Sequence, residues 1–311
     1  MILVVGLSPA WQRTLRFEKF IPGKVNRARH VSETASGKGV NVARVATILG
    51  ADVRLLTVAG GRRGKLLEKS IREKGIGARI IRVQAETRIC QTLLTSNTTT
   101  ELVEEAGALS TAEVKEVLRA FTADVQRADL VVLTGTIPKG CGNDFYARLV
   151  DESKRHGTWV LIDAQEVQLR NALKRGPFLA RVNRDELMAA TRGNHPGNSG
   201  VPQALGRLMR NGPQWAVISD GANNVYISER PGKLLLTLRP PRVKAKNAIG
   251  SGDAMMAGIA IGLLQDMSAL DAARLGIACG AANAMTDEPG FVSLPDVRRL
   301  CWTRDKRVPI V

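Results

Sequence analysis

The sequence predicts an α/β fold in which a mostly parallel sheet carries helices on both faces and a small β appendage. Short apolar runs alternate with helical patterns through most of the 311 residues. Two segments, about 12–35 and about 87–106, interrupt this alternation because they have no clean helical period. The composition, with 44% hydrophobic and 24% charged residues, is that of a globular chain and excludes a disordered one.

The first third of the chain begins with a strand and returns to one after a helix. Ile2–Val5 is an apolar run of strand length. A helix is predicted over Val40–Leu49, where apolar residues recur on one face and Gly50 supplies a stop. Val53–Val58 is again apolar and short, so it predicts a second strand.

The middle of the chain continues the alternation. Ser110 and Glu113 form an S-x-x-E capping box that opens an amphipathic helix over about 110–127. Buried strands follow at Leu130–Leu133, Trp159–Ile162 and Trp215–Ile218, and helical patterns lie near 144–155, 184–191 and 202–210.

The two interrupting segments predict a second, smaller sheet. Residues 87–106 alternate polar and apolar positions, which is typical of strands with one exposed face. We expect both segments to form a lid over a ligand site. No repeat or linker divides the chain, so residues 1–311 are predicted to form one domain with this lid inserted.

Several classes of protein are excluded at this point. The apolar run Ala254–Leu264 is too short to span a bilayer, and the start MILVVG lacks the basic region of a signal peptide. The four cysteines form no CxxC pair, so we expect a reducing, cytoplasmic location without membrane contact. The net charge of +16 is spread along the chain, so we expect an anionic small molecule rather than nucleic acid.

Gly250-Ser-Gly-Asp253 is the richest chemical motif. Its glycines allow the backbone to approach a ligand closely, and a long apolar helix follows. The first N–H groups of a helix have no partner inside it and attract anions such as phosphate. A carboxylate at that point can accept a proton from an attacking hydroxyl. An ordinary helix N-terminus with an acidic residue in its first turn, without any ligand, explains the same residues equally well.

Three weaker motifs accompany it. Ser36-Gly-Lys-Gly-Val-Asn41 places glycines and a cation before a helix but is not a Walker A loop. Arg88 enters the expected lid and can bind phosphate, although a solvated surface arginine is the more usual interpretation of such a residue. Asn183 and Glu186 are three residues apart and can hold Mg²⁺ through water, or can simply cap a helix.

Together these segments resemble the PfkB (ribokinase-like) carbohydrate kinase family, with 1-phosphofructokinase and tagatose-6-phosphate kinase as the most similar subgroup. The resemblance extends over nearly the whole chain and implies a three-layer αβα sandwich with a β lid. The segments in register are Leu7–Pro9, Ser36–Asn41, Glu86–Arg88, Thr134–Gly140, Val182–Glu186, Ser219–Gly221 and Ile249–Asp253.

The resemblance also implies roles for single residues. Asp253 corresponds to the general base, and Gly250, Ser251 and Gly252 correspond to an anion hole for the transferring phosphoryl group. The sugar-phosphate site corresponds to Gln12, Gly37, Lys38, Asn41, Arg88 and Thr136. The nucleotide positions are Ser219, Asp220, Gly221 and Asn283, and those linked to Mg²⁺ are Asn183 and Glu186.

We therefore expect an ATP- and Mg²⁺-dependent kinase for a ketohexose phosphate, with fructose 1-phosphate and tagatose 6-phosphate first. Gln12 stands where family members usually carry Asp, which predicts weaker binding of sugar hydroxyls. A kinase for an unphosphorylated sugar or a nucleoside, and a sugar-phosphate sensor without turnover, remain alternatives. The resemblance also implies a homodimer through the lid, in which Lys24 or Arg27 reaches a neighbour's phosphate.

Overall fold

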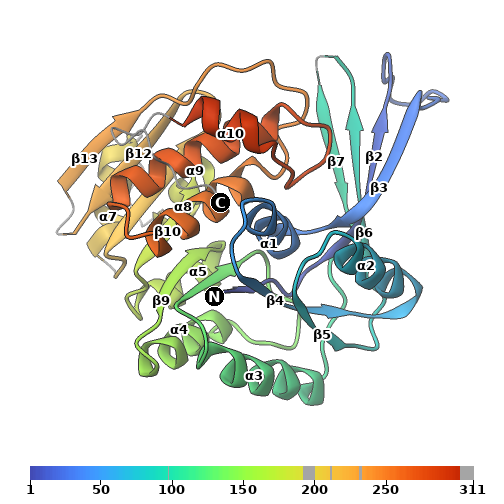
Figure 1. The fold of residues 1–311 in the computed structure, drawn as a ribbon. Helices are drawn as coiled ribbons and strands as arrows, with labels where there is room; N and C mark the ends of the chain where they lie inside the picture. Colours follow the sequence, from blue (N-terminus) through green and yellow to red (C-terminus); the bar gives the residue numbers. More distant parts are fainter. Residues whose placement is uncertain (97, 192–199, 211, 231–232, 302–311) are drawn as a thin grey trace.

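The computed structural model describes two sheets and their flanking helices (Figure 1). It describes residues 1–96, 98–191, 200–210, 212–230 and 233–301. None of the helices in those ranges is long and apolar enough to cross a membrane.

The larger sheet runs in the order β13-β12-β11-β10-β9-β8-β1-β4-β5. Strands β5 to β11 along this order pair in parallel, and β12 and β13 complete the far edge with antiparallel pairs. The order reverses at β1, which lies between β8 and β4, and such a reversal is where ligands bind to open α/β sheets. The strands are β1 (Ile2–Val5), β4 (Val53–Ala59), β5 (Ala78–Arg82), β8 (Leu130–Thr134), β9 (Trp159–Asp163), β10 (Leu179–Asn183), β11 (Trp215–Asp220), β12 (Asn224–Glu229) and β13 (Lys233–Leu238).

Helices cover both faces of this sheet, as the alternation of strands and helices predicts. In β1, Ile2 and Val4 belong to one hydrophobic core and Leu3 and Val5 to the other, because successive side chains of a strand point to opposite faces. The first face carries α1 (Lys38–Ile48), α2 (Gly61–Glu73), α8 (Ser251–Leu264), α9 (Ala269–Ala284) and α10 (Leu294–Leu300). The second carries α3 (Thr111–Val125), α4 (Phe145–Arg155), α5 (Glu166–Leu173), α6 (Arg184–Thr191) and α7 (Val201–Arg210).

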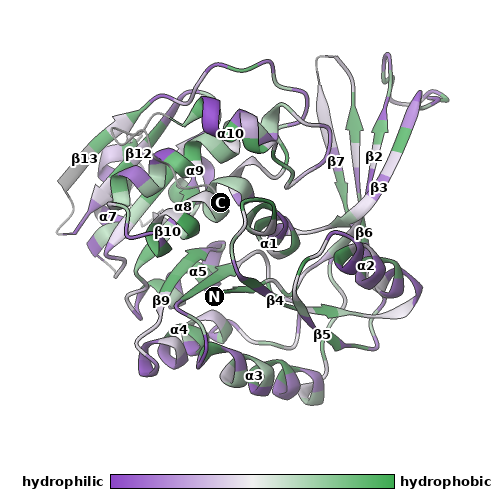
Figure 2. Cartoon of the chain, in the orientation of Figure 1, coloured by the Kyte–Doolittle hydropathy of each residue, from purple (hydrophilic) through white to green (hydrophobic). Residues whose placement is uncertain are grey.

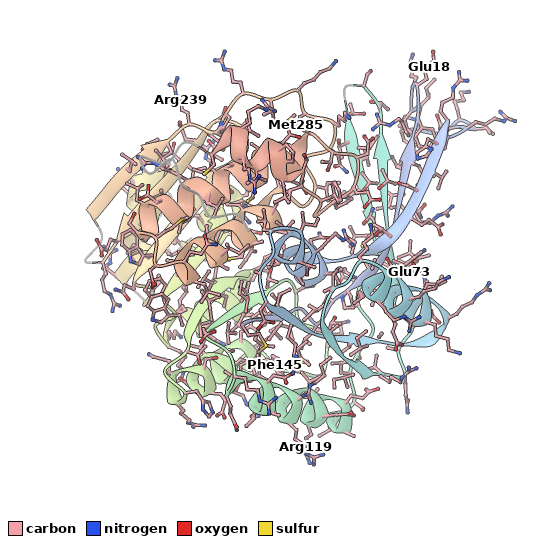
Figure 3. All side chains as sticks on the ribbon, in the orientation of Figure 1. Glu18, Glu73, Arg119, Phe145, Arg239 and Met285 are labelled. Atoms are coloured by element: carbon pink, nitrogen blue, oxygen red, sulfur yellow. The ribbon has the colours of Figure 1, made fainter. Side chains whose placement is uncertain are left out.

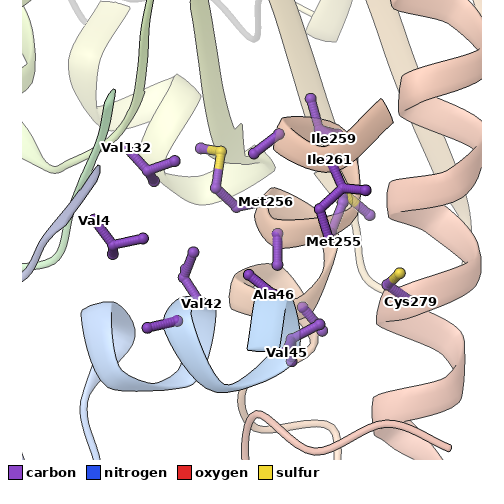
Figure 4. Packing of buried hydrophobic residues seen from close by; sticks show 14 of the residues in the cluster. Val4, Val42, Val45, Ala46, Val132, Met255, Met256, Ile259, Ile261 and Cys279 are labelled. Carbon is purple, nitrogen blue, oxygen red and sulfur yellow. The ribbon is translucent and has the colours of Figure 1, made fainter. Parts of the chain in front are cut away.

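The helices present apolar faces to the sheet and polar faces outward (Figure 2). Charged side chains such as Glu73 on α2 and Arg119 on α3 point away from the molecule (Figure 3). Part of the first core lies where α1 and α8 meet β1 and β8, with Val42 and Met256 near Val4 (Figure 4).

Helices α8 and α9 approach each other especially closely. A Cβ added to Gly258 would lie 2.8 Å from the Cα of Gly276, so only glycine fits at this crossing. The fixed crossing places the N-terminus of α8, with its Gly-Ser-Gly-Asp motif, firmly against the rest of the core.

The smaller sheet has the order β3-β2-β6-β7 and projects beyond the larger one (Figure 1). Its strands are β2 (Ala10–Arg16), β3 (His30–Ser36), β6 (Arg88–Leu94) and β7 (Thr99–Val103). They come from the two segments that interrupt the strand–helix alternation, so the predicted β appendage is confirmed. The predicted fold class, a sandwich of helices, sheet and helices with a separate small sheet, is confirmed with it.

Most predicted elements are present, and the capping box at Ser110 forms with Glu113 as expected. The two elements between β4 and β6, which are α2 and β5, were not predicted. Helix α2 is strongly polar, with only Leu66, Leu67 and Ile71 as large apolar residues, and it begins at glycines, which are weak helix formers. Strand β5 is an edge strand with mostly exposed residues, which weakens its alternation.

Candidate active site

A cavity of about 460 Å³ lies where the carboxyl ends of the large sheet's strands face the small sheet. Its walls include Gly6 after β1, Thr134 at the end of β8 and Asn183 at the end of β10. The small sheet contributes Gln12 and Arg88 from β2 and β6. Most of the predicted transfer, sugar and metal residues meet here: Gln12, Gly37, Lys38, Asn41, Arg88, Thr136, Asn183, Glu186, Gly250, Gly252 and Asp253.

A larger cavity, of about 760 Å³, lies elsewhere, beside the stacked rings of Trp159 and Phe178. It opens near the start of β9, the end of that strand opposite to the first cavity, and contains no predicted site residue. The convergence of motifs therefore identifies the smaller cavity as the candidate active site.

Asp253 sits in the first turn of α8, almost completely buried at 6% exposure. Asn41 from α1 donates its Nδ2–H to Asp253 Oδ2 over 2.7 Å. Burial raises the pKa of the Asp253 carboxyl to about 7 against the opposing charge of Lys38, and Asp163 adds to the rise. A carboxylate with such a pKa can take up a proton near neutral pH.

The pH dependence of the reaction should report this carboxyl. The base accepts a proton only when ionised, so kcat/KM should rise tenfold per pH unit below about 7 and level off above it. Lys38 lowers the pKa of Asp253, so Lys38→Met should move the midpoint to higher pH. The profile is measured with two acceptors, so that titration of a substrate phosphate is recognised by its change between them. A midpoint below pH 5 with both acceptors contradicts the assignment.

The backbone before Asp253 is held in place from behind. Gly250 caps α8 with φ +81, and a Cβ there would lie 2.5 Å from the backbone nitrogen of Gly290. Asn283, on α9 and fully buried, donates Nδ2–H to Ile249 O and to Ser251 Oγ, at 2.9 and 3.1 Å. Its Oδ1 accepts from Gly290 N over 2.8 Å, so Asn283 links the segment at Ile249–Ser251 to the loop at Gly290.

Arg44 fixes the same loop from the side of the small sheet. Its guanidinium is 1% exposed and donates through Nη1 to Pro289 O over 2.7 Å. Nη2 donates to Ala35 O at the end of β3. Burial lowers the pKa of Arg44 to about 10, but it stays charged at neutral pH. The side chain therefore ties the root of the small sheet to the loop behind Gly250.

Lys38 and two residues that the sequence did not single out form a charged group on the sheet side of the cavity. Lys38 Nζ donates to Asp163 Oδ1 over 2.6 Å, and Arg181 Nη1 donates to Asp163 Oδ2 over 2.8 Å. Asp163 is fully buried at the end of β9. Burial raises the pKa of Asp163, but Lys38 and Arg181 outweigh it and hold that pKa below its usual range. The carboxylate thus stays ionised and holds two cations at once.

Asn183 and Glu186 cap α6 reciprocally. Glu186 Oε2 accepts from Asn183 N, and Asn183 Oδ1 accepts from Glu186 N, both over 2.8 Å. Glu186 Oε1 accepts from Gln165 Nε2 over 2.9 Å and lies 3.6 Å from Lys38 Nζ. The capping interpretation of this motif is therefore correct, and both residues also line the cavity.

These residues fit Mg²⁺ only in company with a ligand. Among the residues placed by the structure, no group of three His, Cys, Asp or Glu side chains could hold a metal ion. Mg²⁺ commonly binds through one or two carboxylates together with substrate phosphates and water. Glu186 lines the cavity together with Glu101, Glu105 and Asp253, and a metal role for it stays a prediction.

The small sheet gives the cavity a mixed charge. Gln12 is 3% exposed and donates Nε2–H to Thr92 Oγ1 over 2.8 Å within the sheet. Arg88 donates to Glu104 O and Ser8 O, each over 3.0 Å, which orients its guanidinium. Glu101 and Glu105 from the β7 side also line the cavity and were not anticipated, because a strand's exposed carboxylates usually face solvent.

The predicted nucleotide residues lie outside the cavity lining. Ser219 Oγ accepts from Arg181 Nη2 over 2.8 Å, so it joins the site through that arginine. Asp220 lies 3.8 Å from Arg184, and Gly221 forms the turn to β12 with φ +54. A nucleotide role for these residues and for Asn283 stays a prediction.

Comparisons with known proteins agree with this architecture. Residues 1–296 match the model of the pfkB family carbohydrate kinases. A tagatose-6-phosphate kinase of Staphylococcus epidermidis is 28% identical over 298 residues, which cover 94% of this chain and 95% of that protein.

Solved structures share the fold. Phosphofructokinase-2 from Escherichia coli in complex with fructose-6-phosphate superposes with a TM-score of 0.83 at 21% identity, over 96% of this chain and 97% of that one. A possible 1-phosphofructokinase from Thermotoga maritima gives 0.85 at 21% identity, over 96% of each chain. Because the family model spans nearly the whole chain, the protein belongs to the pfkB family of carbohydrate kinases, enzymes that transfer phosphate to a hydroxyl group.

Proposed function

We propose that the protein transfers the γ-phosphoryl group of ATP to a hydroxyl of a ketohexose phosphate, giving a bisphosphate. Fructose 1-phosphate and tagatose 6-phosphate are the first candidates. The single observation that carries the proposal is the buried Asp253 carboxyl, hydrogen-bonded to Asn41 at the N-terminus of α8 inside a sugar-sized cavity.

For this reaction the protein must position the two reactants and stabilise the charge on the transferring phosphoryl group. Phosphoryl transfer needs little covalent help, and holding the reactants in line supplies about 7–11 kcal/mol. Asp253 takes the proton of the acceptor hydroxyl, and Asn41 holds the carboxylate in place. The first amides of α8 face the charge that develops on the transferring group. Mg²⁺, when bound with the nucleotide beside Glu186, supplies further neutralisation of phosphate charge.

The experiment is a coupled ADP-release assay over a panel of acceptors. The panel contains fructose 1-phosphate, tagatose 6-phosphate, fructose 6-phosphate, the free sugars and adenosine. We expect a sugar phosphate to give the highest kcat/KM. Asp253→Asn, purified in the same way, controls for a contaminating kinase. Thermal stabilisation by a sugar phosphate without ADP release would instead identify a sensor.

An unphosphorylated acceptor is the second candidate, and one observation favours it. Glu101 and Glu105 line the lid side of the cavity beside Arg88, and Lys38 is already paired with Asp163. Two carboxylates repel a phosphate, whereas they accept hydrogen bonds from sugar hydroxyls. Faster turnover of a free sugar than of any sugar phosphate would establish this candidate.

Arg88→Ala separates the two candidates. A hydrogen bond to a charged group contributes about 1.5–3 kcal/mol, so loss of Arg88 should raise KM for a sugar phosphate about 10- to 100-fold with little change in kcat. KM for a neutral sugar should change less than threefold. Arg82→Ala, which removes an exposed arginine paired with Glu68, is the matched control and should leave both KM values unchanged. Equal effects of Arg88→Ala on both kinds of acceptor would remove the phosphate-binding role.

A further inference from the structure

Arg181 is an arginine inside an otherwise apolar strand, and it reaches the start of α8. It is 7% exposed, lies in the middle of β10 and lines the active-site cavity. A Cβ added to Gly252 would lie 2.5–2.7 Å from its guanidinium atoms. Glycine at position 252 therefore allows the guanidinium to rest directly against the first turn of α8, where the anion hole is expected.

The guanidinium is held rigidly but retains donors for a ligand. Nη1 donates to Asp163 and Nη2 to Ser219, each over 2.8 Å. Nε is buried and has no hydrogen-bond partner in the part of the chain that the structure places. A guanidinium carries five N–H donors, so two protein acceptors leave three for other partners. A buried donor without a partner is unfavourable, and an acceptor oxygen of a bound anion would satisfy it.

Two cations and two carboxylates meet beside the cavity. Lys38 pairs with Asp163 and lies 3.6 Å from Glu186, and Arg181 pairs with Asp163 and donates to Ser219, so only part of the guanidinium is occupied by protein acceptors. Burial lowers the pKa of Arg181, but Asp163 outweighs it and raises that pKa, so the guanidinium stays charged throughout the working pH range. Arginine also matches the planar, forked geometry of phosphate oxygens better than lysine does.

We propose that Arg181 is a catalytic residue that donates hydrogen bonds to the phosphoryl group in transfer, and that Asp163 is the positioning residue that orients it. The proposal rests on the proposed phosphoryl transfer. In that step the acceptor oxygen bonds to the γ-phosphorus as the bond to the bridging oxygen of the β-phosphate breaks. The bridging oxygen keeps the electron pair and leaves with ADP. The acceptor proton passes to Asp253, and Arg181 stabilises the charge without exchanging a proton.

The test compares Arg181→Met and Arg181→Lys with Arg54→Met. Arg54 donates to the buried Asp124 over 3.0 Å, so it makes the same kind of ion pair outside the cavity. We expect Arg181→Met to lower kcat at least 100-fold, to raise KM for ATP about tenfold and to leave KM for the acceptor within about threefold. Arg181→Lys should recover part of the loss, since an ammonium still donates. Arg54→Met should keep kcat within twofold.

A measurement of nucleotide binding tests the role of Arg181 without knowing which sugar is the acceptor. Calorimetry compares the affinity for ADP with that for a non-hydrolysable ATP analogue in each folded variant. Arg181→Met should reduce the preference for the analogue at least tenfold, and Arg54→Met should leave it unchanged. If the wild type turns over no acceptor, the proposed function fails, and this preference alone decides the role of Arg181. A folded Arg181→Met protein with wild-type kcat, or in the absence of turnover with an unchanged preference, overturns the inference.

Discussion

Replacing Asp253 by Asn should abolish most of the activity and yet make the protein more stable at alkaline pH. A general base contributes on the order of 10²- to 10⁴-fold to a rate, so kcat should fall by that amount. Asn keeps the size of the side chain, and its oxygen can still accept from Asn41 Nδ2. The loss therefore reports the missing carboxylate and not a collapsed site. The ADP-release assay measures it.

The stability gain follows from the raised pKa of Asp253. The folded-state pKa is about 7, whereas an exposed Asp titrates near 3.8. Between these values the folded protein holds a proton that the unfolded chain releases, so the stability of the wild type falls as pH rises from about 4 to 7. Each unit of pKa difference corresponds to about 1.4 kcal/mol, so ionisation of Asp253 lowers the free energy of unfolding above pH 7 by at most about 4 kcal/mol. An asparagine does not ionise and avoids this loss.

Thermal unfolding at pH 5 and pH 8.5 measures this difference. Tm of Asp253→Asn should exceed that of the wild type at pH 8.5, and the gap should shrink at pH 5. Asp163→Asn is the matched control, because Asp163 is equally buried but its pKa is lowered by Lys38 and Arg181. Its ionised form stabilises the fold above its unfolded-state pKa and ceases to do so as pH falls, so Asp163→Asn should lower Tm at pH 8.5. A lower Tm for Asp253→Asn at pH 8.5 would show that the ionised Asp253 carboxylate does not destabilise the folded protein.

Most of the site residues that the sequence singles out come to line one cavity, although their roles stay predictions. Glycines and a carboxylate just before a long apolar helix identify the start of α8, and parallel strands bring such loops to one edge of a sheet. The glycine-flanked Lys38 and Asp253 stand out in the sequence itself, whereas Asn41 is identified only through the family resemblance. The fold brings Asn41 and Asp253 together although more than 200 residues separate them.

Residues that act through a neighbouring strand are harder to find. Arg181 and Asp163 are each a single charge within or beside an apolar run, and their pairing depends on the register of β9 and β10. Arg44 occupies a helix position that looks exposed by composition, but α1 is buried on nearly all sides because the small sheet and the loop at Pro289 cover it. In each case the sequence shows a charged residue among apolar ones, and only the tertiary structure shows which group it binds.

Gly250→Ala should remove most of the activity through the backbone alone. Gly250 has φ +81, a conformation that costs other residues roughly 1–2 kcal/mol. An alanine Cβ would also lie 2.5 Å from the backbone nitrogen of Gly290, which Asn283 holds in place. Neither backbone can give way cheaply, so the loop must shift and the first amides of α8 move with it.

Loss of one donor from an anion hole lowers kcat by about 10²- to 10³-fold, and we expect Gly250→Ala to fall in that range. Gly75→Ala is the matched control: Gly75 follows α2 with φ +68, and a Cβ there meets nothing within 4 Å. It should share the backbone strain, lower Tm by a few degrees and leave kcat unchanged. Steady-state kinetics and thermal unfolding of both variants separate the effect of backbone strain on stability from the effect of loop displacement on kcat. Wild-type kcat in a folded Gly250→Ala protein would mean that the amides before Asp253 do not bind the transferring group.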